Sequence, residues 1–415
     1  MVGNKPDRIF ELRKYMQRPY FCRFIAVLTL LCLLVPASGV LAANCVLTVS
    51  VPATTPDDSQ IWITGSHDLL GNWNGKGAQL KEIGPNLFEF AANLPVGVEI
   101  EYKFTRGSFA TVEKTAQGHE KTNRKLRISG NANHGERINV EAWADQITAT
   151  PAAPQINGWY SLFRNVTSEN LEPARDVIVW LPPSYPRNRT LRYPVIYMHD
   201  GQNLFDANTA FGGNEWGVDE VMLDYIAGTH CGQINEAIVV GIYNTSERMS
   251  EYTPFPDPKH SGGNGDNYVR FIVEELKPMI DKQFRTRPDR QNTFICGSSL
   301  GGLISLYAGI AHPQTFGGII AMSPSIWWAN GAIIDWLLEH DIAGYKGKIW
   351  LDMGTREGEE AIEFTRKLAG EIGKNAPGFK GLRYREFSGA THSEKSWRQR
   401  LHLPLRFLLG PTGRP

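Results

Sequence analysis

Cysteine is scarce in this sequence, with five residues in 415. Two of them, Cys22 and Cys32, fall in an N-terminal segment that we expect to be removed after synthesis. The other three, Cys45, Cys231 and Cys296, are an odd number, so the sequence predicts no disulfide framework. Their spacing does not match a zinc site either, and we expect no metal.

An excess of one charge is also absent, because 43 Lys and Arg residues balance 43 Asp and Glu residues. No basic run interleaved with aromatic residues occurs in the body of the chain. Proteins that bind nucleic acid need such clusters to neutralise phosphates, so nucleic acid is not an expected partner. The hydrophobic content of 42% is ordinary for a soluble globular protein, and the length favours two domains.

Long apolar runs are missing too. The most apolar segment, residues 24–35, is shorter than the ~20 residues of a membrane-spanning helix. Basic residues precede it and small residues follow it, which is typical of a signal peptide. We expect residues 1–42 to be removed by cleavage after Ala42 or Ala43, and the protein to be periplasmic or secreted without stable membrane association. An uncleaved anchor is the alternative, and translation from Met16 would give a signal peptide of ordinary length.

Residues 43–143 alternate short β-preferring runs with turn residues and contain no long helical pattern. This pattern predicts a small all-β sandwich. The expected strands include residues 46–51, 60–64, 87–91, 99–104 and 137–143. Residues 144–155 are rich in alanine, threonine and proline, and we expect them to form a semi-extended linker.

Residues 156–415 alternate strand and helix patterns, which predicts an α/β domain with a mostly parallel sheet and helices on both faces. We expect ligands to bind beyond the carboxyl ends of its strands. The expected strands are 176–181, 195–199, 237–242, 293–296, 317–322, 348–353 and 382–387. The expected helices are 215–228, 267–284, 300–311, 333–339, 359–372 and 394–409.

One short stretch of this second domain, Gly297-Ser298-Ser299-Leu300-Gly301, matches G-x-S-x-G between an apolar strand and a helix. In a nucleophile elbow the central serine stands on a strained turn, and the glycines are needed because a Cβ would strike the neighbouring helix or strand. We therefore predict that Ser299 is a nucleophile. The alternative is an inert serine in a glycine-rich turn.

A serine nucleophile needs a general base and an acid that orients the base. In α/β-hydrolases both follow the serine along the chain, the acid before the histidine. Three of the later histidines (His312, His340 and His402) fall at helix ends or within a helix, whereas His392 lies in a small-residue loop after the last strand. We predict His392 as base and Glu357, in the loop after strand 348–353, as acid. The alternatives are a solvated loop histidine and a carboxylate that favours a helix N-terminus.

Several further motifs resemble the esterase family of α/β-hydrolases that includes esterase D-like enzymes, feruloyl and acetyl xylan esterases, and enterochelin esterases. They are residues 197–206 (YMHDGQNLFD), Arg248 with 251–254 (EYTP), the Ser299 elbow, 323–328 (SPSIWW), 354–357 (GTRE), and His392 with Glu394 and Trp397. The match spans nearly the whole second domain. It implies the same three catalytic residues, although some family members do without the acid.

The resemblance also implies that the backbone N–H groups of Gln202 and Leu300 form the oxyanion hole. Trp327 and Trp328 are expected near the substrate pocket, where they could contact an aromatic acyl group or a sugar ring. Core packing is the alternative for both tryptophans. We expect Arg248 and Glu251 to form a structural ion pair.

The first domain resembles the starch-binding family 20 carbohydrate-binding modules. The matching residues are 70–73 (LGNW), Leu94-Pro95 with Gly97, 101–104 (EYKF), and Glu120 with Asn123-Arg124. The resemblance implies that Trp73 and Lys103 bind glucan, a flat ring stacking on a pyranose while a lysine donates to hydroxyls. His119 stands where the family has a second tryptophan, and Phe109 could compensate. The alternative is a sandwich that only supports the enzyme.

Together these features predict an exported serine carboxylesterase that uses a Ser-His-Glu triad, an acyl-enzyme and no cofactor. We expect a small-molecule or oligosaccharide ester substrate, and the attached module favours acylated carbohydrates. A siderophore trilactone esterase of the enterochelin type is the first alternative. The second is a catalytically inert carbohydrate-binding protein.

Overall fold

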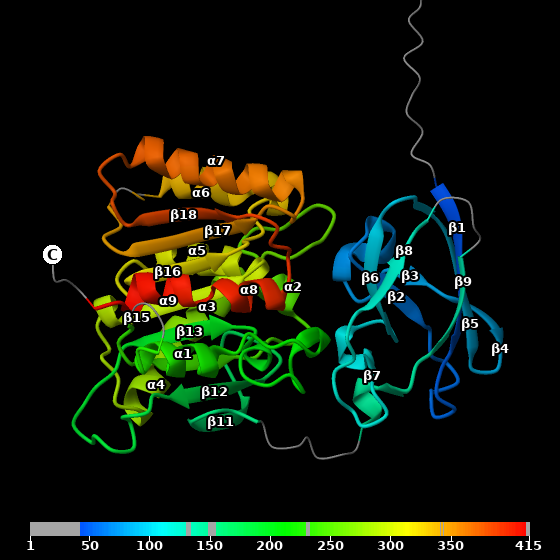
Figure 1. Cartoon of the computed structure of the whole chain (residues 1–415), viewed down its shortest axis with the longest axis horizontal. Coiled ribbons are helices and arrows are strands. Elements are labelled where there is room, and N and C mark those ends of the chain that lie inside the picture. The colour runs from blue at the N-terminus through cyan, green and yellow to red at the C-terminus, as the bar shows by residue number, and fades with distance from the viewer. Residues whose placement is uncertain are drawn as a thin grey trace, which may run out of the picture. The chain divides into compact units, whose positions relative to one another are not determined.

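The structure is a computed structural model that describes residues 42–129, 134–147, 155–229, 233–340, 342 and 344–411 (Figure 1). The predicted signal peptide up to residue 41, Cys231 and residues 148–154 of the predicted linker lie outside these ranges. Among the helices within them, none has both the length and the apolar character needed to cross a bilayer.

The N-terminal region is built from two four-stranded sheets, which agrees with the predicted all-β fold. One sheet has the order β4 (Lys81–Gly84), β5 (Leu87–Pro95), β1 (Ala42–Ser50) and β9 (His134–Asn139). The other has the order β3 (Ala78–Gln79), β2 (Trp62–Gly65), β6 (Glu99–Thr105) and β8 (Arg124–Arg127). A short pair, β7 (Glu113–Lys114) and β10 (Ala142–Trp143), accompanies them.

The two sheets share a hydrophobic core to which only residues of this region contribute. Alternate residues of β1 (Cys45, Leu47 and Val49) are fully buried, which is the period of a half-buried strand. Three short 3₁₀ helices, η1 (Asp68–Trp73), η2 (Phe109–Thr111) and η3 (Ala144–Gln146), connect the strands or follow them. A separate core of this kind lets the region fold by itself, and we call it the module.

The second region contains an eight-stranded sheet that is parallel except at its first two strand pairs. Its order is β11 (Trp159–Val166), β12 (Arg175–Leu181), β14 (Ile238–Ile242), β13 (Val195–His199), β15 (Thr293–Ser298), β16 (Gly318–Met322), β17 (Lys348–Gly354) and β18 (Leu382–Phe387). The prediction of a mostly parallel sheet is confirmed. The edge strand β11 was not predicted, because most of its residues are only partly buried and the expected apolar run is missing.

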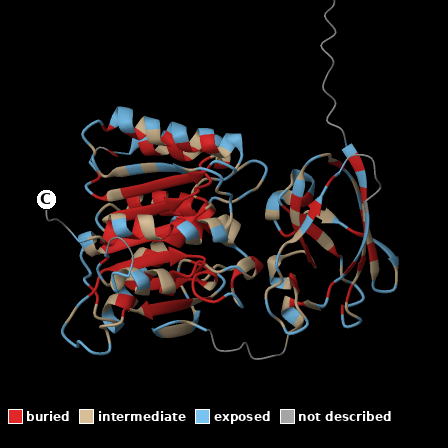
Figure 2. Ribbon diagram, viewed as in Figure 1, coloured by how far each residue is buried: buried red, intermediate tan, exposed pale blue. Residues whose placement is uncertain are grey.

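Helices cover both faces of this sheet and leave the central strands buried (Figures 1 and 2). One core packs under α3 (Gly265–Arg270), η6 (Phe271–Leu276), α4 (Lys277–Gln283), α5 (Leu300–Ala311), α6 (Ala332–Glu339) and α7 (Glu359–Asn375). The other packs under α1 (Val218–Ile226), α8 (Glu394–Arg400) and α9 (His402–Leu409). The short helices are α2 (Arg248–Glu251), η4 (Gly201–Asn203), η5 (Phe211–Gly213), η7 (Arg290–Asn292) and η8 (Trp328–Gly331).

Two of the predicted helices are interrupted. Residues 267–284 contain the π-helical segment η6 just before Pro278, a residue that cannot donate a helical hydrogen bond. Residues 394–409 divide into α8 and α9 around Leu401. Neither break lies in the loops after β13, β15, β17 and β18. These four loops all follow the carboxyl ends of parallel strands.

Candidate active site

The turn between β15 and α5 holds Ser299 in a backbone conformation with φ 57° and ψ −126°. A non-glycine residue seldom adopts positive φ, and such strain is typical of a nucleophile elbow. A Cβ on Gly297 would lie 2.6 Å from the carbonyl carbon of Gly301, and a Cβ on Gly301 would lie 3.3 Å from the Cβ of His199. Gly297 therefore lets the end of β15 approach the first turn of α5, and Gly301 lets α5 approach His199 at the end of β13.

A continuous chain of hydrogen bonds joins the three residues predicted for catalysis. His392 Nε2 lies 2.9 Å from the Ser299 hydroxyl, and His392 Nδ1 lies 2.8 Å from Glu357 Oε2. The Trp397 ring stands edge-on to the imidazole, with ring centroids 5.0 Å apart. The structure thus brings together residues 35 and 93 positions apart in the sequence, with the spacing that proton transfer from serine to histidine requires.

Glu357 is held by groups on the loops around it, and its side chain has no exposed surface. Its Oε1 accepts hydrogen bonds from the Gly354 backbone N–H at 2.8 Å and from the Ser323 hydroxyl at 2.7 Å. Burial by itself raises the pKa of Glu357, but the hydrogen bond and charge of His392, the Ser323 bond and the Arg400 charge together lower it below its ordinary value. The carboxylate stays ionised, as an orienting acid must.

A buried arginine, Arg400 of α8, connects this carboxylate to the sheet. Its Nη2 contacts the Ser323 hydroxyl at 2.6 Å and Glu357 Oε1 at 3.5 Å, and its Nε donates to Asp352 Oδ1 at 3.1 Å. The other oxygen of Asp352 accepts the Trp350 indole N–H at 2.7 Å. Asp352 therefore supports Arg400 inside the core, and Glu357 alone of these two carboxylates contacts the histidine.

The residues predicted for the oxyanion hole lie on two loops that follow neighbouring parallel strands, β13 and β15. Leu300 is the first residue of α5 and Gln202 is the second residue of η4, so neither backbone N–H has a partner within its own helix. Gly201 permits this turn to lie against β14, because a Cβ there would come within 2.6 Å of the Gly241 backbone. The oxyanion role of both N–H groups stays a prediction.

An ion pair fixes the turn before Gln202. Asp200, in the left-handed conformation with φ 55°, accepts hydrogen bonds from Arg248 Nε at 2.7 Å and Arg248 Nη2 at 2.9 Å. The prediction of an Arg248–Glu251 ion pair is wrong, because Glu251 pairs with the buried Arg175 at 2.7 Å instead. The α-helical turn of α2 points the two side chains to different partners, which sequence proximity does not indicate.

Glu394 is a further titratable group near the histidine that the sequence did not assign to the site. Burial is the main cause that raises its pKa to about 7, and the charge of Asp200 adds to the shift, whereas His392 and Arg248 oppose it. The available signal was its position two residues after His392, within a motif shared with the esterase family. A carboxyl that titrates near neutral pH beside a catalytic base can affect the pH dependence of activity.

The two tryptophans predicted for the substrate pocket have different surroundings. Trp328 is 2% exposed and its indole N–H donates to the Phe255 carbonyl at 2.7 Å, so it is a core residue and its assignment to the pocket is wrong. The hydrogen bond to Phe255 satisfies the indole N–H inside the protein. Two adjacent tryptophans in a loop motif give no sign of such a bond. Trp327 is partly buried with its ring centroid 6.1 Å from that of Trp328, and it stays a candidate for contact with substrate.

In the module, the residues predicted for sugar binding have partners in the protein. Lys103 is completely buried, and its ammonium group donates to Glu120 Oε2 at 3.0 Å and to the Lys121 carbonyl. The Trp73 ring is partly buried and lies edge-on to the ring of Phe211, with centroids 5.7 Å apart. His119 is exposed. Sugar binding by these three residues stays a prediction.

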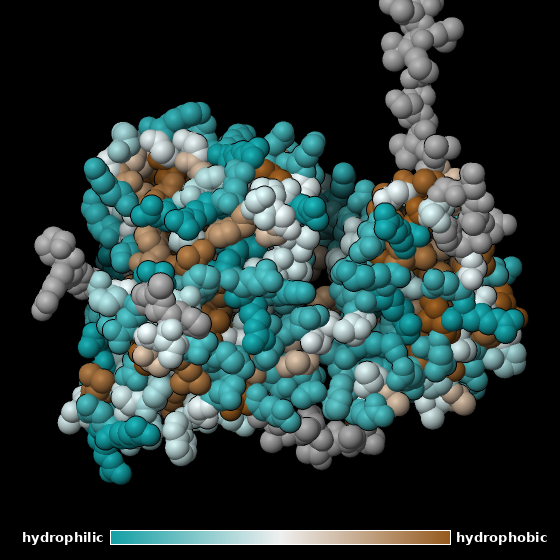
Figure 3. All heavy atoms as spheres, in the orientation of Figure 1, coloured by the Kyte–Doolittle hydropathy of each residue, from teal (hydrophilic) through white to brown (hydrophobic). Residues whose placement is uncertain are grey.

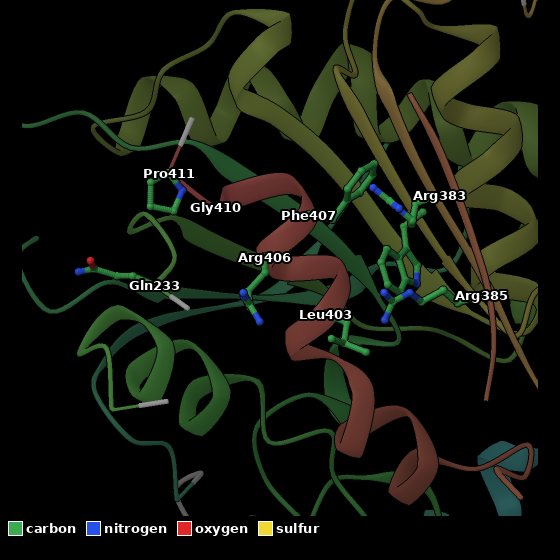
Figure 4. A pocket seen from close by; sticks show the side chains of 9 residues that line it. Gln233, Arg383, Arg385, Leu403, Arg406, Phe407, Gly410 and Pro411 are labelled. Carbon is green, nitrogen blue, oxygen red and sulfur yellow. The ribbon is translucent and has the colours of Figure 1, made fainter. Parts of the chain in front are cut away.

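A separate hollow of about 630 Å³ lies between α9 and the first residues of β17 and β18 (Figure 4). Its lining includes three arginines, Arg383, Arg385 and Arg406, together with Trp350 and Phe407. Trp350 and Arg383 stand near the starts of their strands, whereas Glu357 and His392 follow the strand ends. The hollow is therefore not part of the catalytic arrangement. Within the described ranges no group of three or more metal-binding side chains occurs.

This fold and this serine–histidine–carboxylate arrangement define a serine hydrolase with the α/β-hydrolase architecture. Residues 168–408 match the family described as "Putative esterase", and the chain belongs to this family of carboxylic ester hydrolases. Residues 44–137 match the family described as "Starch binding domain". The resemblances seen in the sequence of both domains are confirmed.

Three known proteins illustrate these similarities. The ferri-bacillibactin esterase BesA of Bacillus subtilis is 36% identical over 190 residues, which are 41% of this chain and 60% of BesA. The alpha-amylase of Niallia circulans is 39% identical over 100 residues, 24% of this chain and 7% of the amylase. The structure of an IroE-like serine hydrolase from Shewanella oneidensis superposes with a TM-score of 0.51 and 25% identity, covering 60% of this chain and 80% of that one. The chain spans less than two thirds of the length of BesA and of the amylase.

Proposed function

We propose that this protein is an exported serine carboxylesterase in which Ser299, His392 and Glu357 act together. The observation that supports the proposal most strongly is the pair of hydrogen bonds, 2.9 Å and 2.8 Å, that joins the serine, the imidazole and the carboxylate. The strained elbow and the complete burial of the Glu357 side chain are further observations in its favour. A loop serine in a structural role would need none of these features.

In the proposed reaction, the Ser299 oxygen attacks the ester carbonyl carbon while His392 Nε2 takes the hydroxyl proton. The backbone N–H groups of Gln202 and Leu300 stabilise the negative oxygen of the tetrahedral intermediate. His392 then gives its proton to the leaving alcohol, and an acyl-enzyme on Ser299 remains. Water attacks this ester, again losing its proton to His392, and the carboxylic acid leaves as Ser299 regains its proton.

Glu357 acts by orienting the imidazole and stabilising the imidazolium that forms in each step. Ser323 and Arg400 keep it in place, since both contact the oxygen that does not face His392. Trp397 limits the tilt of the imidazole from the side and donates its indole N–H to Ser323 at 3.0 Å. These three residues are positioning residues.

We propose esters of carbohydrates as the substrate class. The starch-binding domain supports this, because a glucan-binding module would bring the enzyme to polysaccharide. Trp327 lies in the loop that follows β16, two residues after Ser325, whose hydroxyl lies 3.3 Å from that of Ser299. Export rests on the N-terminal sequence pattern alone.

A siderophore ester is the second candidate substrate, and the similarity to BesA favours it. The third hypothesis, an inert hydrolase domain, is the least supported, because an inactive enzyme has no need to keep the hydrogen-bonded chain from serine to carboxylate.

Purified protein assayed on p-nitrophenyl acetate, acetylated oligosaccharides and a ferric catecholate trilactone tests these proposals. Carbohydrate-ester turnover with a higher kcat/KM than trilactone turnover supports the first substrate class, and the reverse supports the second. Absence of turnover on all three by folded protein would favour an inert domain.

A further inference from the structure

The ring of Phe211 in η5, a residue of the esterase domain, lies on the predicted sugar-binding surface of the module. Its centroid is 5.7 Å from that of Trp73 and 6.2 Å from that of Phe109, in edge-to-face geometry with both. The ammonium group of Lys103 lies 4.9 Å from the same centroid. Trp73 and Lys103, which we assign to glucan, and Phe109, which could compensate for the missing second tryptophan, therefore meet one phenyl ring from elsewhere in the chain.

These contacts use the surfaces that a sugar would need. A pyranose stacks on an aromatic ring and accepts hydrogen bonds from a nearby cation, and a phenyl ring satisfies the same groups by edge-to-face and cation–π contact. Lys103 has no exposed surface and already donates to Glu120. A glucan could reach Trp73 and Lys103 on their Phe211 side only after that ring had moved.

The segment that carries Phe211 is bonded to the loop predicted to stabilise the oxyanion. The Phe211 backbone N–H donates to Asn203 Oδ1 at 2.8 Å, and the Thr209 hydroxyl donates to the Gln202 carbonyl at 2.6 Å. Gly212 follows with φ 67°, so the chain turns sharply just after the ring. Displacing Phe211 therefore disturbs a segment directly bonded to Gln202.

We infer that Phe211 and glucan compete for the platform formed by Trp73, Lys103 and Phe109, and that glucan binding slows ester hydrolysis by loosening the Gln202 loop. This inference rests on the glucan-binding part of the proposed function. Glucan shifts the equilibrium between the platform covered by Phe211 and the uncovered platform because it binds only the uncovered form. The coupling between glucan binding and the Gln202 loop is reciprocal.

The test compares maltoheptaose binding, by calorimetry, to the full chain, to its Phe211→Ala variant and to the isolated module, residues 42–147. Losing an aromatic competitor should tighten binding by several-fold to roughly tenfold, so Phe211→Ala and the isolated module should both bind more tightly than the full chain. Trp159→Ala is the matched control, because it removes a ring that is 61% exposed in the same domain. This control should bind like the unaltered chain.

Equal affinity of the full chain, Phe211→Ala and the isolated module would overturn the competition and leave glucan binding intact. No binding by the isolated module, with ester hydrolysis retained, would remove the glucan part of the proposed function and the inference with it. The isolated module carries no substitution. Comparing its affinity with that of the full chain therefore tests the competition even if Phe211→Ala fails to fold.

The second measurement is the kcat for p-nitrophenyl acetate with and without saturating maltoheptaose. We expect kcat to fall several-fold in the full chain and to stay constant in Phe211→Ala, where glucan displaces no ring. An unchanged kcat in the full chain at saturation would overturn the link to the Gln202 loop.

Discussion

The catalytic arrangement and the sugar platform were predicted by the same kind of motif reasoning, yet the structure places them differently. Ser299, His392 and Glu357 are partners of one another, so folding alone brings them within hydrogen-bond distance. The predicted functional partner of Trp73 and Lys103 is a glucan ligand. In its place the structure shows Glu120 and the ring of Phe211. A site whose partners are internal can be checked from geometry, whereas a site that awaits a ligand needs a binding measurement.

The largest effect that separates the two regions is expected from Ser299→Ala. Loss of the nucleophile should lower kcat for p-nitrophenyl acetate by at least about 10³-fold without changing maltoheptaose binding by the module. Ser298→Ala is the matched control, since Ser298 is a buried neighbour at the end of β15 and should keep most of the activity. Retention of more than roughly a thousandth of kcat in folded Ser299→Ala would show that another residue is the nucleophile.

The second effect concerns the acid. Glu357→Gln should lower kcat less than His392→Ala does, because the acid orients and stabilises the imidazolium but accepts no proton from substrate. The two variants are compared in kcat and in thermal unfolding at the same pH. Activity of Glu357→Gln equal to that of the unaltered enzyme would indicate a serine–histidine dyad or a different carboxylate.

The third effect tests the sugar platform in the isolated module. Trp73→Ala should abolish detectable maltoheptaose binding, because it removes the stacking surface. His119→Trp should tighten binding several-fold, since it adds an aromatic contact of about 1 kcal/mol. Affinity electrophoresis in soluble starch measures both. No retardation of the unaltered module or of His119→Trp would leave the module without a glucan-binding role.

The smallest effect is a change in pH dependence. Since burial raises the pKa of Glu394 to about 7, ionisation above that pH places a negative charge near His392 and should favour the imidazolium formed during catalysis. Glu394→Gln should therefore lower kcat by a few-fold at pH 8 and hardly at all at pH 6. A uniform loss at both pH values would assign Glu394 a purely structural role.

The same group provides a stability check with a defined sign. A carboxyl whose pKa is higher in the folded than in the unfolded state destabilises the protein as pH rises from its unfolded value through its folded value of about 7. Thermal unfolding of Glu394→Gln should therefore match the unaltered enzyme near pH 4 and occur at a higher temperature at pH 8. A lower temperature at pH 8 would contradict the raised pKa.

Much of the esterase domain was predictable because its signals are local. Ser299 was identified by glycines on a strand-to-helix turn, and His392 and Glu357 by their positions in loops after parallel strands. Trp328 and Trp327 could not be told apart, because the indole bond to Phe255 joins segments 73 residues apart. The partners of Arg248 and Glu251 could not be predicted either, because both partners are distant in the sequence. The packing of α2 determines them, and sequence spacing does not.

The contact of Phe211 with the module had no sequence signal. A phenylalanine followed by two glycines does not by itself indicate a contact, and the significance of Phe211 comes from Trp73, Phe109 and Lys103 around it. Burial of Lys103 was likewise not predictable, since lysines are usually exposed and this one depends on Glu120 as a partner.

The central claim, that Ser299 carries the acyl group during ester hydrolysis, is tested most directly by peptide mass spectrometry after rapid quenching with a slowly hydrolysed p-nitrophenyl ester. We predict one acyl group per chain, located on Ser299, absent from Ser299→Ala and formed far more slowly in His392→Ala. Turnover without a covalent acyl group, or an acyl group on Ser298 or any other residue, would contradict it.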